Sequence, residues 1–166
     1  MSKHFHSDVL VIGSGAAGLT LALQLAQHAR VKVLSKRALN EGSTWWAQGG
    51  IAAVLDDEDT VEAHVTDTLK AGAGLCHEDA VRFTVERSRA AIRWLIDQGV
   101  DFTREGADGA YHLTQEGGHS HRRIIHSADA TGRAVHSTLT ERVQAQSNIE
   151  VFEHHIAVNL ISQADQ

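Results

Sequence analysis

A short apolar run that ends at three spaced glycines restricts the fold of this chain more than any other feature. Residues 9–12 are continuously apolar, which is the pattern of a parallel strand buried on both faces. Gly13, Gly15 and Gly18 then follow as G-x-G-x-x-G, and residues 19–26 carry an apolar helical pattern. A strand, a glycine turn and a helix in this order form the context that a dinucleotide-binding motif requires.

Each glycine of the turn has a physical role in such a motif. Gly13 allows the tight turn from strand to helix, Gly15 lets a pyrophosphate approach the backbone, and Gly18 allows the helix to pack closely on the strand. The anion would lie at the helix N-terminus, where N–H groups without helical partners and the helix dipole favour negative charge. With residues 31–34 as a second strand, the sequence predicts a β-α-β unit over residues 8–35.

The end of the second predicted strand departs from the usual dinucleotide pattern. An acidic residue at this position normally binds the ribose hydroxyls, whereas this chain has Ser35, Lys36 and Arg37. Two interpretations stay open. Either Ser35 and Lys36 hold the ribose and phosphates less directly, or Lys36 and Arg37 meet the 2′-phosphate of NADP, as in an NADP-dependent dehydrogenase.

Composition restricts the class of protein without indicating a function. The 166 residues are 42% hydrophobic and 22% charged, as in an ordinary globular protein with one domain and a core. A net charge of -6 argues against a nucleic-acid partner or a membrane partner, and no apolar run is long enough to span a bilayer, so we expect a cytoplasmic protein. The single cysteine, Cys76, excludes an internal disulfide and a multi-cysteine metal site.

Residues 40–53 combine glycines with two adjacent tryptophans. They contain Gly42, Trp45, Trp46, Gly49 and Gly50. The glycines interrupt both helical and strand periodicity, so we expect no regular element here. The backbone either passes close to a flat ligand or forms a loop whose tryptophans fill a core, and the spacing alone favours neither interpretation.

The rest of the chain is predicted to form amphipathic helices and short strands. We expect a first helix that ends near residues 28–30, a helix from residue 61 that is closed by Gly72 and Gly74, a helix that starts near residue 79, and a helix after Thr131 with Val135, Leu139 and Val143 on one face. We also expect a hairpin of 100–102 with 111–113, and strands at 148–152 and 156–161. Gly99 is a natural C-cap, and Asp129 and Thr131 are placed to cap the helix that follows them. The acidic run 56–59 is expected to be solvated.

A second cluster of polar residues lies in residues 115–126. It contains Glu116, His119, His121, Arg122 and Arg123. The glycines at 117 and 118 place backbone N–H groups and Glu116 on an exposed turn, and the basic residues supply positive charge suited to a dicarboxylate. A solvated basic loop would have the same spacing. No third ligand with suitable spacing joins the two histidines, so we expect no metal site.

Three segments of the chain resemble a known family. G-S-G-A-A-G-L at residues 13–19 and G-S-T-W-W-A-Q-G-G-I-A-A at residues 42–53 together resemble the flavoprotein superfamily of succinate dehydrogenase, fumarate reductase and L-aspartate oxidase. E-G-G-H-S-H-R-R-I-I-H-S-A-D-A-T-G-R at residues 116–133 is very close to the L-aspartate oxidase pattern. The resemblance implies an α/β fold, namely a Rossmann-like FAD-binding domain with a parallel sheet and an inserted helical and hairpin segment, truncated before the capping domain.

The resemblance also implies the cofactor and the residues that hold it. Non-covalent FAD is implied, because Ser43 stands where the membrane-complex members carry a histidine that bonds to the flavin. The adenine end is implied near residues 156–158. The implied FAD-binding residues are Gly13, Ser14, Gly15, Ala16, Ala17, Gly18, Ser35, Lys36, Ser43, Thr44, Trp45, Trp46, Ala47, Gln48, Gly49, Gly50 and Ala157.

The family members are several times longer than this chain. The resemblance therefore implies that residues 1–166 are the N-terminal part of an oxidoreductase domain, with the β-α-β unit at 8–35, an insertion over about 37–126, and a returning helix and strands over about 129–161. The catalytic arginine base and most of the capping domain are expected beyond Gln166. The fragment alone is expected to be inactive.

Within the superfamily the chain looks most like the L-aspartate oxidases, because Glu116 stands where fumarate reductases have an apolar residue. The glutamate is implied to orient the substrate through its ammonium group, which succinate lacks. The implied activity is FAD-dependent oxidation of L-aspartate to iminoaspartate, with oxygen or fumarate as the electron acceptor. This reaction is the first step of de novo NAD biosynthesis, and its product would pass to quinolinate synthase.

Two alternatives to this activity stay open. The chain is either part of a fumarate reductase or succinate dehydrogenase flavoprotein, which the residues at positions 43 and 116 distinguish, or, as an isolated fragment, a non-catalytic nucleotide-binding module.

Overall fold

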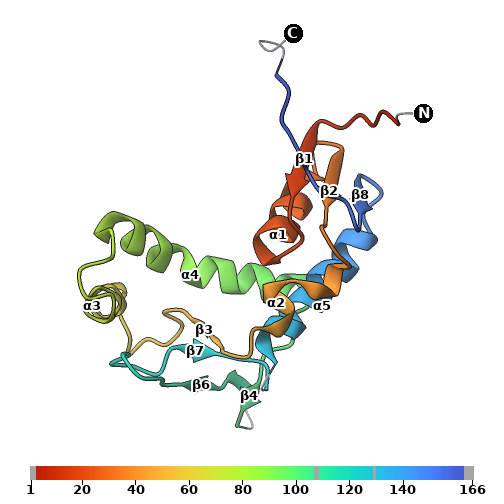
Figure 1. Cartoon of the computed structure of the whole chain (residues 1–166). Helices are drawn as coiled ribbons and strands as arrows, with labels where there is room; N and C mark the ends of the chain where they lie inside the picture. The colour runs from red at the N-terminus through yellow and green to blue at the C-terminus, as the bar shows by residue number, and fades with distance from the viewer. Residues whose placement is uncertain (1–2, 107–108, 129, 163–166) are drawn as a thin grey trace. The chain divides into compact units, whose positions relative to one another are not determined.

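The computed structural model describes residues 3–106, 109–128 and 130–162 (Figure 1). The chain divides into two compact units. The first unit consists of Met1–Trp46 and Val135–Gln166, and the second of Ala47–Ala134. Among the described residues, no helix combines the length and the apolar character needed to cross a membrane.

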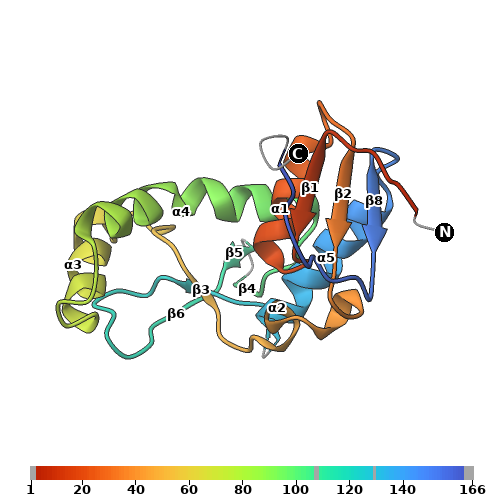
Figure 2. The ribbon, with the colours of Figure 1, turned by 45° about the horizontal axis from the view of Figure 1, so that its top comes forward.

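The first unit contains a parallel three-stranded sheet. β1 (Val9–Ile12), β2 (Val31–Leu34) and β8 (Ile149–Phe152) lie side by side in the order β1-β2-β8 (Figure 2). Val9 aligns with Val31, and Val31 with Ile149. The predicted β-α-β unit and parallel sheet are therefore confirmed, with the strand after the last helix next to β2.

α1 (Ala16–Leu25) joins β1 to β2 and covers one face of the sheet. Its Ala22 packs with Val11, Val31 and Val33 in a buried apolar core. The helix ends before the predicted residues 28–30, because the amides of His28 and Ala29 both donate to the carbonyl of Leu25 and form a turn.

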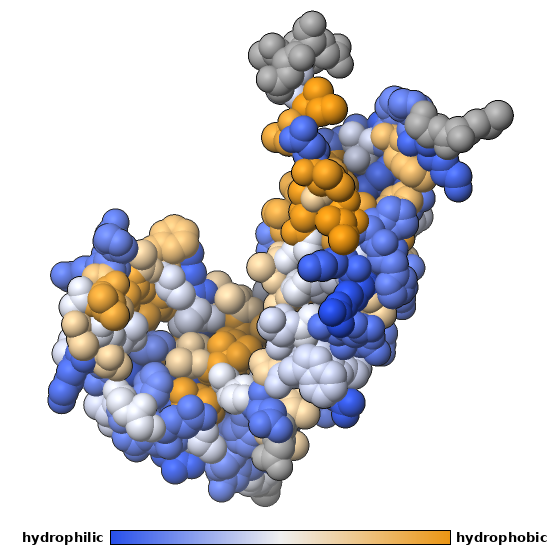
Figure 3. All heavy atoms as spheres, viewed as in Figure 1, coloured by the Kyte–Doolittle hydropathy of each residue, from blue (hydrophilic) through white to orange (hydrophobic). Residues whose placement is uncertain are grey.

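The prediction that β1 is buried on both faces is wrong. Side chains alternate between the faces of a strand, so Val9 and Val11 face α1, whereas Leu10 and Ile12 are 51% and 68% exposed. Figure 3 shows hydrophobic side chains gathered on the surface over β1 and the C-terminal segment.

The predicted strand at residues 156–161 is absent from the structure. Residues 155–162 carry no helix or strand, and Ile156, Val158, Leu160 and Ile161 are exposed. A strand requires partners for its backbone N–H and C=O groups, and none of the described strands pairs with this segment.

The prediction that residues 40–53 form no regular element is wrong, because short elements lie within residues 39–52. They are the 3-10 helix η1 (Leu39–Glu41), α2 (Ser43–Trp46) and β3 (Ile51–Ala52). Gly42 lies in extended conformation between η1 and α2, and Gly49 and Gly50 lie between α2 and β3. The glycines therefore separate these elements rather than prevent them.

The second unit contains two packed helices. α3 (Val61–Ala71) begins after Thr60, whose hydroxyl accepts from the N–H of Ala63 at 3.1 Å. α4 (Glu78–Gln98) ends at Gly99, which has the left-handed conformation of the predicted C-cap. Val65 of α3 and Val85 of α4 pack with Val54 in a buried apolar core.

In the described part of the second unit, five short strands pair in antiparallel fashion. β7 (Ile124–Ile125) lies between β3 and β6 (Leu113–Thr114), while β4 (Arg104–Glu105) pairs with β5 (Ala110–Tyr111). The hairpin exists, but its strands are Arg104–Glu105 and Ala110–Tyr111, not residues 100–102 and 111–113, and Leu113 belongs to β6. Val100 and Phe102 are buried, so their segment packs as core instead of pairing.

α5 (Thr131–Gln144) begins in the second unit and continues into the first. Val135, Leu139 and Val143 are buried, which confirms the predicted apolar face. Thr131 does not cap the helix. It is the first helical residue, and its hydroxyl accepts from the N–H of Ser127 at 3.1 Å. Asp129, the other predicted cap, lies outside the described residues.

Candidate functional site

The glycine turn between β1 and α1 has a backbone that requires glycine at two positions. Gly13 has a φ of +113°, which side chains with a Cβ rarely adopt, and its N–H donates to the carbonyl of Leu34 at 2.9 Å. A Cβ on Gly18 would lie 2.0 Å from the carbonyl oxygen of Gly13. The first turn of α1 is thus held directly against the end of β1.

The N-terminus of α1 is suited to an anionic ligand. Gly15 is the N-cap in extended conformation and has no side chain that could accept from the helix N–H groups, and the first turn contains no acidic residue. A Cβ placed on Gly13 would meet no atom within 4 Å, so there is space beside the turn in the described structure. Because a phosphate can accept hydrogen bonds from helix N–H groups, these residues fit a dinucleotide pyrophosphate.

Side chains from three segments hold the glycine turn. The Ser14 hydroxyl lies 2.8 Å from the hydroxyl of Ser35, and both residues are buried. The Ala16 N–H donates to Oγ1 of Thr44 in α2 at 3.1 Å. The structure therefore brings together three of the segments that the sequence assigned to a cofactor.

The residues after β2 differ in their surroundings. Ser35 is buried and shares a hydrogen bond with Ser14, whereas Lys36 and Arg37 are exposed. Arg37 forms an ion pair with Glu41 at 3.3 Å. Its guanidinium thus already has a carboxylate partner.

The second glycine segment is divided between the units. Within the first unit, Ser43 and Trp46 are exposed at the ends of α2. Within the second unit, the carbonyl of Ala47 accepts from the N–H of Gly132 at 3.0 Å, and a Cβ on Gly50 would lie 2.4 Å from Cγ2 of Ile124. Gln48 and Gly49 are exposed.

Glu116 lies on a tight turn of the second unit. Its carbonyl accepts from the N–H of His119 at 3.2 Å, and Gln115 closes the turn by donating to the carbonyl of His119 at 2.7 Å. Gly118 has a φ of +87°. The Glu116 side chain is exposed on this turn, as predicted.

The prediction that Arg123 offers its charge to a dicarboxylate is wrong. Its side chain is fully buried and donates from Nε and Nη2 to both carboxylate oxygens of Asp59, at 2.8 and 2.7 Å. Its Nη1 donates to Asp67 at 2.8 Å. The acidic run 56–59 is correspondingly not solvated throughout, because Asp59 is buried as the partner of this arginine.

Asp67 connects this buried ion cluster to the turn that carries Glu116. Its Oδ2 accepts from both the N–H and the hydroxyl of Ser120 at 2.7 Å. Burial acts to raise the pKa of Asp67, but the hydrogen bonds from Ser120 and Arg123 outweigh this effect and lower the pKa to about 2. Asp67 therefore stays ionised and holds Ser120 in place.

Two pairs of histidines lie in the second unit. The His64 and His119 rings are 5.7 Å apart, and the Nδ1 atoms of both are buried without a hydrogen-bond partner among the described residues. Burial, together with the charge of Arg123, lowers the pKa of His64. His112 and His126 share a hydrogen bond of 2.9 Å between Nδ1 and Nε2. Neither pair belongs to a group of three or more potential metal ligands within the described parts of the chain.

The family of the chain follows from comparison with known proteins. The family model described as "FAD binding domain" matches residues 8–166. The chain belongs to this FAD-binding domain family. FAD is accordingly the cofactor, which favours the FAD interpretation of the glycine turn over the NADP interpretation of Lys36 and Arg37.

Curated relatives of this FAD-binding chain include L-aspartate oxidases. The chain is 63% identical to the L-aspartate oxidase of Pseudomonas aeruginosa over 98% of its own length, and 58% identical to that of Yersinia pestis over 97%. It spans 31% of the length of each of these two relatives.

Solved structures confirm the α/β FAD-binding fold. A quinol fumarate reductase from E. coli superimposes with a TM-score of 0.87 at 31% identity, covering 92% of this chain and 26% of that chain. A flavocytochrome c3 fumarate reductase gives 0.81 at 25% identity, covering 96% of this chain and 28% of that chain.

The structure also shows contacts of the glycine turn and of Arg123 that the sequence did not predict. His136 contacts the glycine turn, and Asp59 and Asp67 neutralise Arg123. The place of Arg123 directly before the apolar pair Ile124 and Ile125 was the available signal, since an arginine beside a buried strand requires acidic partners. For His136 no sequence signal was available.

Proposed function

We propose that the protein containing this chain is an L-aspartate oxidase, a flavoenzyme that oxidises L-aspartate to iminoaspartate. Family membership and the identity to two L-aspartate oxidases support this proposal. The observation that carries it is Glu116, an exposed carboxylate on a tight turn whose neighbours are fixed by buried charges.

The cofactor's pyrophosphate would bind at the glycine turn. The N–H groups at the start of α1, apart from that of Ala16, which donates to Thr44, would donate to it, because the first N–H groups of a helix have no partner inside the helix. Ser35 and Lys36 would lie at the ribose, residues 43–50 beside the flavin, and Ala157 near the adenine. Ser43 offers no group that would replace the covalent histidine, so FAD would be held non-covalently. Bound FAD supplies the acceptor for the hydride that leaves Cα of the substrate.

Glu116 would set the choice of substrate. An exposed carboxylate can pair with the ammonium group of L-aspartate, and this contact has no counterpart in succinate. Arg123 would not bind the substrate carboxylates, since its buried guanidinium already donates from all three nitrogens to Asp59 and Asp67. The carboxylates would need cationic groups other than Arg123.

The proposal includes the electron acceptor, the enzyme that receives the product and the compartment. Oxygen or fumarate would reoxidise the cofactor, and iminoaspartate would pass to quinolinate synthase in de novo NAD biosynthesis, in the cytoplasm. The structural similarity to a fumarate reductase makes fumarate reduction or succinate oxidation the second candidate.

One experiment separates the two candidates. The full-length protein that contains residues 1–166 is purified, its flavin is identified by absorbance after acid release, and its reduction is followed anaerobically with L-aspartate and with succinate. Reduction by L-aspartate and not by succinate is expected. Reduction by succinate alone would reject the proposal and support the second candidate.

A further inference from the structure

A buried histidine of α5 contacts the glycine turn from a distant part of the sequence. His136 is 1% exposed, and its Nε2 lies 3.0 Å from the carbonyl oxygen of Ser14, 122 residues earlier in the chain. A carbonyl oxygen only accepts hydrogen bonds, so Nε2 carries the proton and donates it. This is a buried, directional bond between α5 and the turn.

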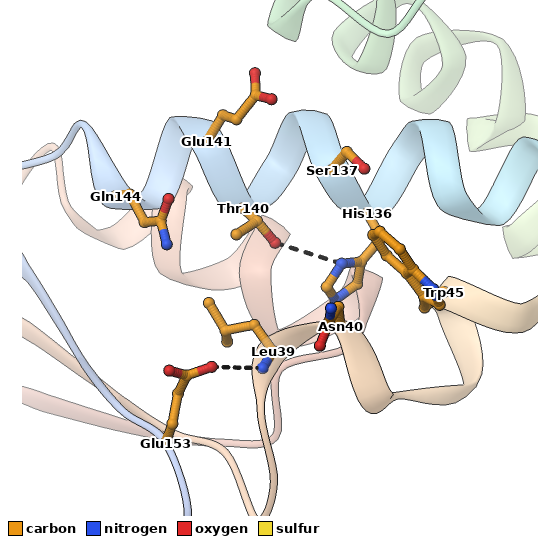
Figure 4. Close-up of a pocket in the computed structure, with 9 residues that line it drawn as sticks. All are labelled: Leu39, Asn40, Trp45, His136, Ser137, Thr140, Glu141, Gln144 and Glu153. Carbon is orange, nitrogen blue, oxygen red and sulfur yellow. Dashed lines mark hydrogen bonds between the residues drawn. The ribbon is translucent and has the colours of Figure 1, made fainter.

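The surroundings of His136 hold its ring in this orientation. Nδ1 lies 3.4 Å from Oγ1 of Thr140, one helical turn further along, so the threonine hydroxyl is placed to donate to the unprotonated nitrogen. The Trp45 ring packs edge to face against the imidazole at 5.9 Å (Figure 4). Rotation of the imidazole would break both contacts.

The bond to Ser14 determines the direction of one N–H group of the turn. The carbonyl of Ser14 and the N–H of Gly15 belong to the same planar trans peptide, so they point in opposite directions. When His136 holds the carbonyl from the α5 side, the Gly15 N–H must point away from α5. The Ala16 N–H already donates to Thr44, so the Gly15 N–H is the group of the turn that this bond orients.

We propose that His136 is a positioning residue of the FAD site. It donates to Ser14 and so aims the Gly15 N–H at the cofactor's pyrophosphate. The proposal rests on the assignment of the glycine turn to FAD. His136 would act through the peptide of Ser14 and Gly15, which makes it a positioning residue and not a catalytic one.

The first test measures FAD affinity in the full-length apoprotein by flavin fluorescence quenching. His136→Phe fills the space without a donor, and His136→Gln keeps an N–H donor at a similar reach. Loss of the donor is expected to weaken FAD binding about tenfold, the size of one buried hydrogen bond. His136→Gln is expected to stay within about threefold of the parent. Parent-like affinity of His136→Phe, or equal losses in both variants, would overturn the proposal.

Leu139→Ala is the matched control. Leu139 is fully buried on the same helix and makes no hydrogen bond to the turn through its side chain. This variant is expected to lower the melting temperature while the folded protein keeps the parent affinity for FAD. A loss of affinity equal to that of His136→Phe would mean that any damage to α5 has this effect, and it would overturn the positioning role.

A chemical rescue tests the donor directly. His136 lines a groove of about 340 Å³ together with Trp45, Thr140 and Glu153, so a small molecule can approach the space left by His136→Ala (Figure 4). Imidazole, which has an N–H donor, is expected to restore FAD affinity, whereas neutral 1-methylimidazole, which lacks one, is not. Equal rescue by both compounds, or rescue by neither, would contradict the donor role.

These measurements separate the two proposals. FAD affinity is read without L-aspartate, so an unchanged affinity in His136→Phe overturns the positioning role even if the parent oxidises L-aspartate. Conversely, a parent that binds FAD through His136 but does not oxidise L-aspartate overturns the proposed function alone.

Discussion

Arg123 and Asp59 form a bidentate ion pair, joined by two hydrogen bonds with N–O distances of 2.8 and 2.7 Å, and both side chains are almost completely buried. Asp67 completes the cluster at 2.8 Å and also accepts from Ser120, which follows the Glu116 turn. Paired buried charges stay fixed because separating them in a low-dielectric interior is unfavourable. The cluster therefore gives the Glu116 turn a rigid base.

Removing the arginine is expected to destabilise the protein strongly. Arg123→Met leaves Asp59 buried without its cationic partner, which should lower the free energy of unfolding by about 3 to 5 kcal/mol. Urea denaturation of the full-length protein, followed by tryptophan fluorescence, measures this change. Arg30→Met is the control, because the ion pair of Arg30 with Asp8 is exposed and should be worth at most about 1 kcal/mol. Similar losses in both variants would contradict the role of burial.

The lowered pKa of Asp67 predicts that the stability of the fold depends on pH. Its pKa of about 2 in the folded protein lies below the ordinary value of 3.8, so the folded state favours the carboxylate. The resulting stabilisation, on the order of 2 kcal/mol, is present above pH 4 and is lost as the pH falls from about 4 to 2. The stability difference between the parent and Asp67→Asn should therefore shrink over that range. A difference that stays constant from pH 5 to pH 2 would contradict this assignment.

Two adjacent glycines should respond differently to alanine. A Cβ on Gly50 would lie 2.4 Å from Cγ2 of Ile124 and 2.6 Å from the carbonyl of Ile125, so Gly50→Ala should strain the pairing of β3 with β7 by about 1 to 3 kcal/mol. A Cβ on Gly49 would meet no atom within 4 Å, so Gly49→Ala should stay within about 0.5 kcal/mol of the parent. Thermal unfolding measures the stability of both variants. Equal melting temperatures would show that the close approach of Gly50 to Ile124 does not constrain the residue at position 50.

Glu116→Gln tests substrate recognition. Loss of the carboxylate removes the partner proposed for the substrate ammonium, so kcat/KM for L-aspartate should fall by about tenfold or more, mainly through KM. The KM for fumarate as electron acceptor should change little, since fumarate has no ammonium group. Glu58→Gln, at another exposed glutamate of the same unit, makes the same charge change and should leave both constants unaltered. Equal effects of Glu116→Gln on both substrates would rule out the ammonium contact.

Features that depend on neighbouring residues were predictable from the sequence. The strand, glycine turn and helix of residues 9–25 follow from local periodicity and from the backbone freedom of Gly13. The C-cap at Gly99 and the buried face of α5 follow in the same way. The spacing of the glycines indicates a dinucleotide, because it reflects how a backbone approaches a phosphate, and the resemblance of three segments to a flavoprotein family implied that the dinucleotide is FAD.

Features that depend on distant residues required the tertiary structure. The sequence specified where Arg123, Asp59 and Asp67 stand, but only folding showed that the arginine is buried between them and is unavailable to a substrate. Likewise, Leu10 and Ile12 have the apolar character of core residues, yet their burial depends on whether another segment covers that face of β1.

The glycine turn shows most clearly which properties the sequence determines and which depend on the tertiary structure. The sequence by itself determined that residues 13–18 form a tight glycine turn between a strand and a helix, because conformation and close packing at Gly13 and Gly18 are local properties. Only the tertiary structure decided which groups hold that turn, since Ser35, Thr44 and His136 reach it from 21 to 122 residues away. A hydrogen bond over that distance in the chain depends on how whole elements pack, and no local pattern encodes it.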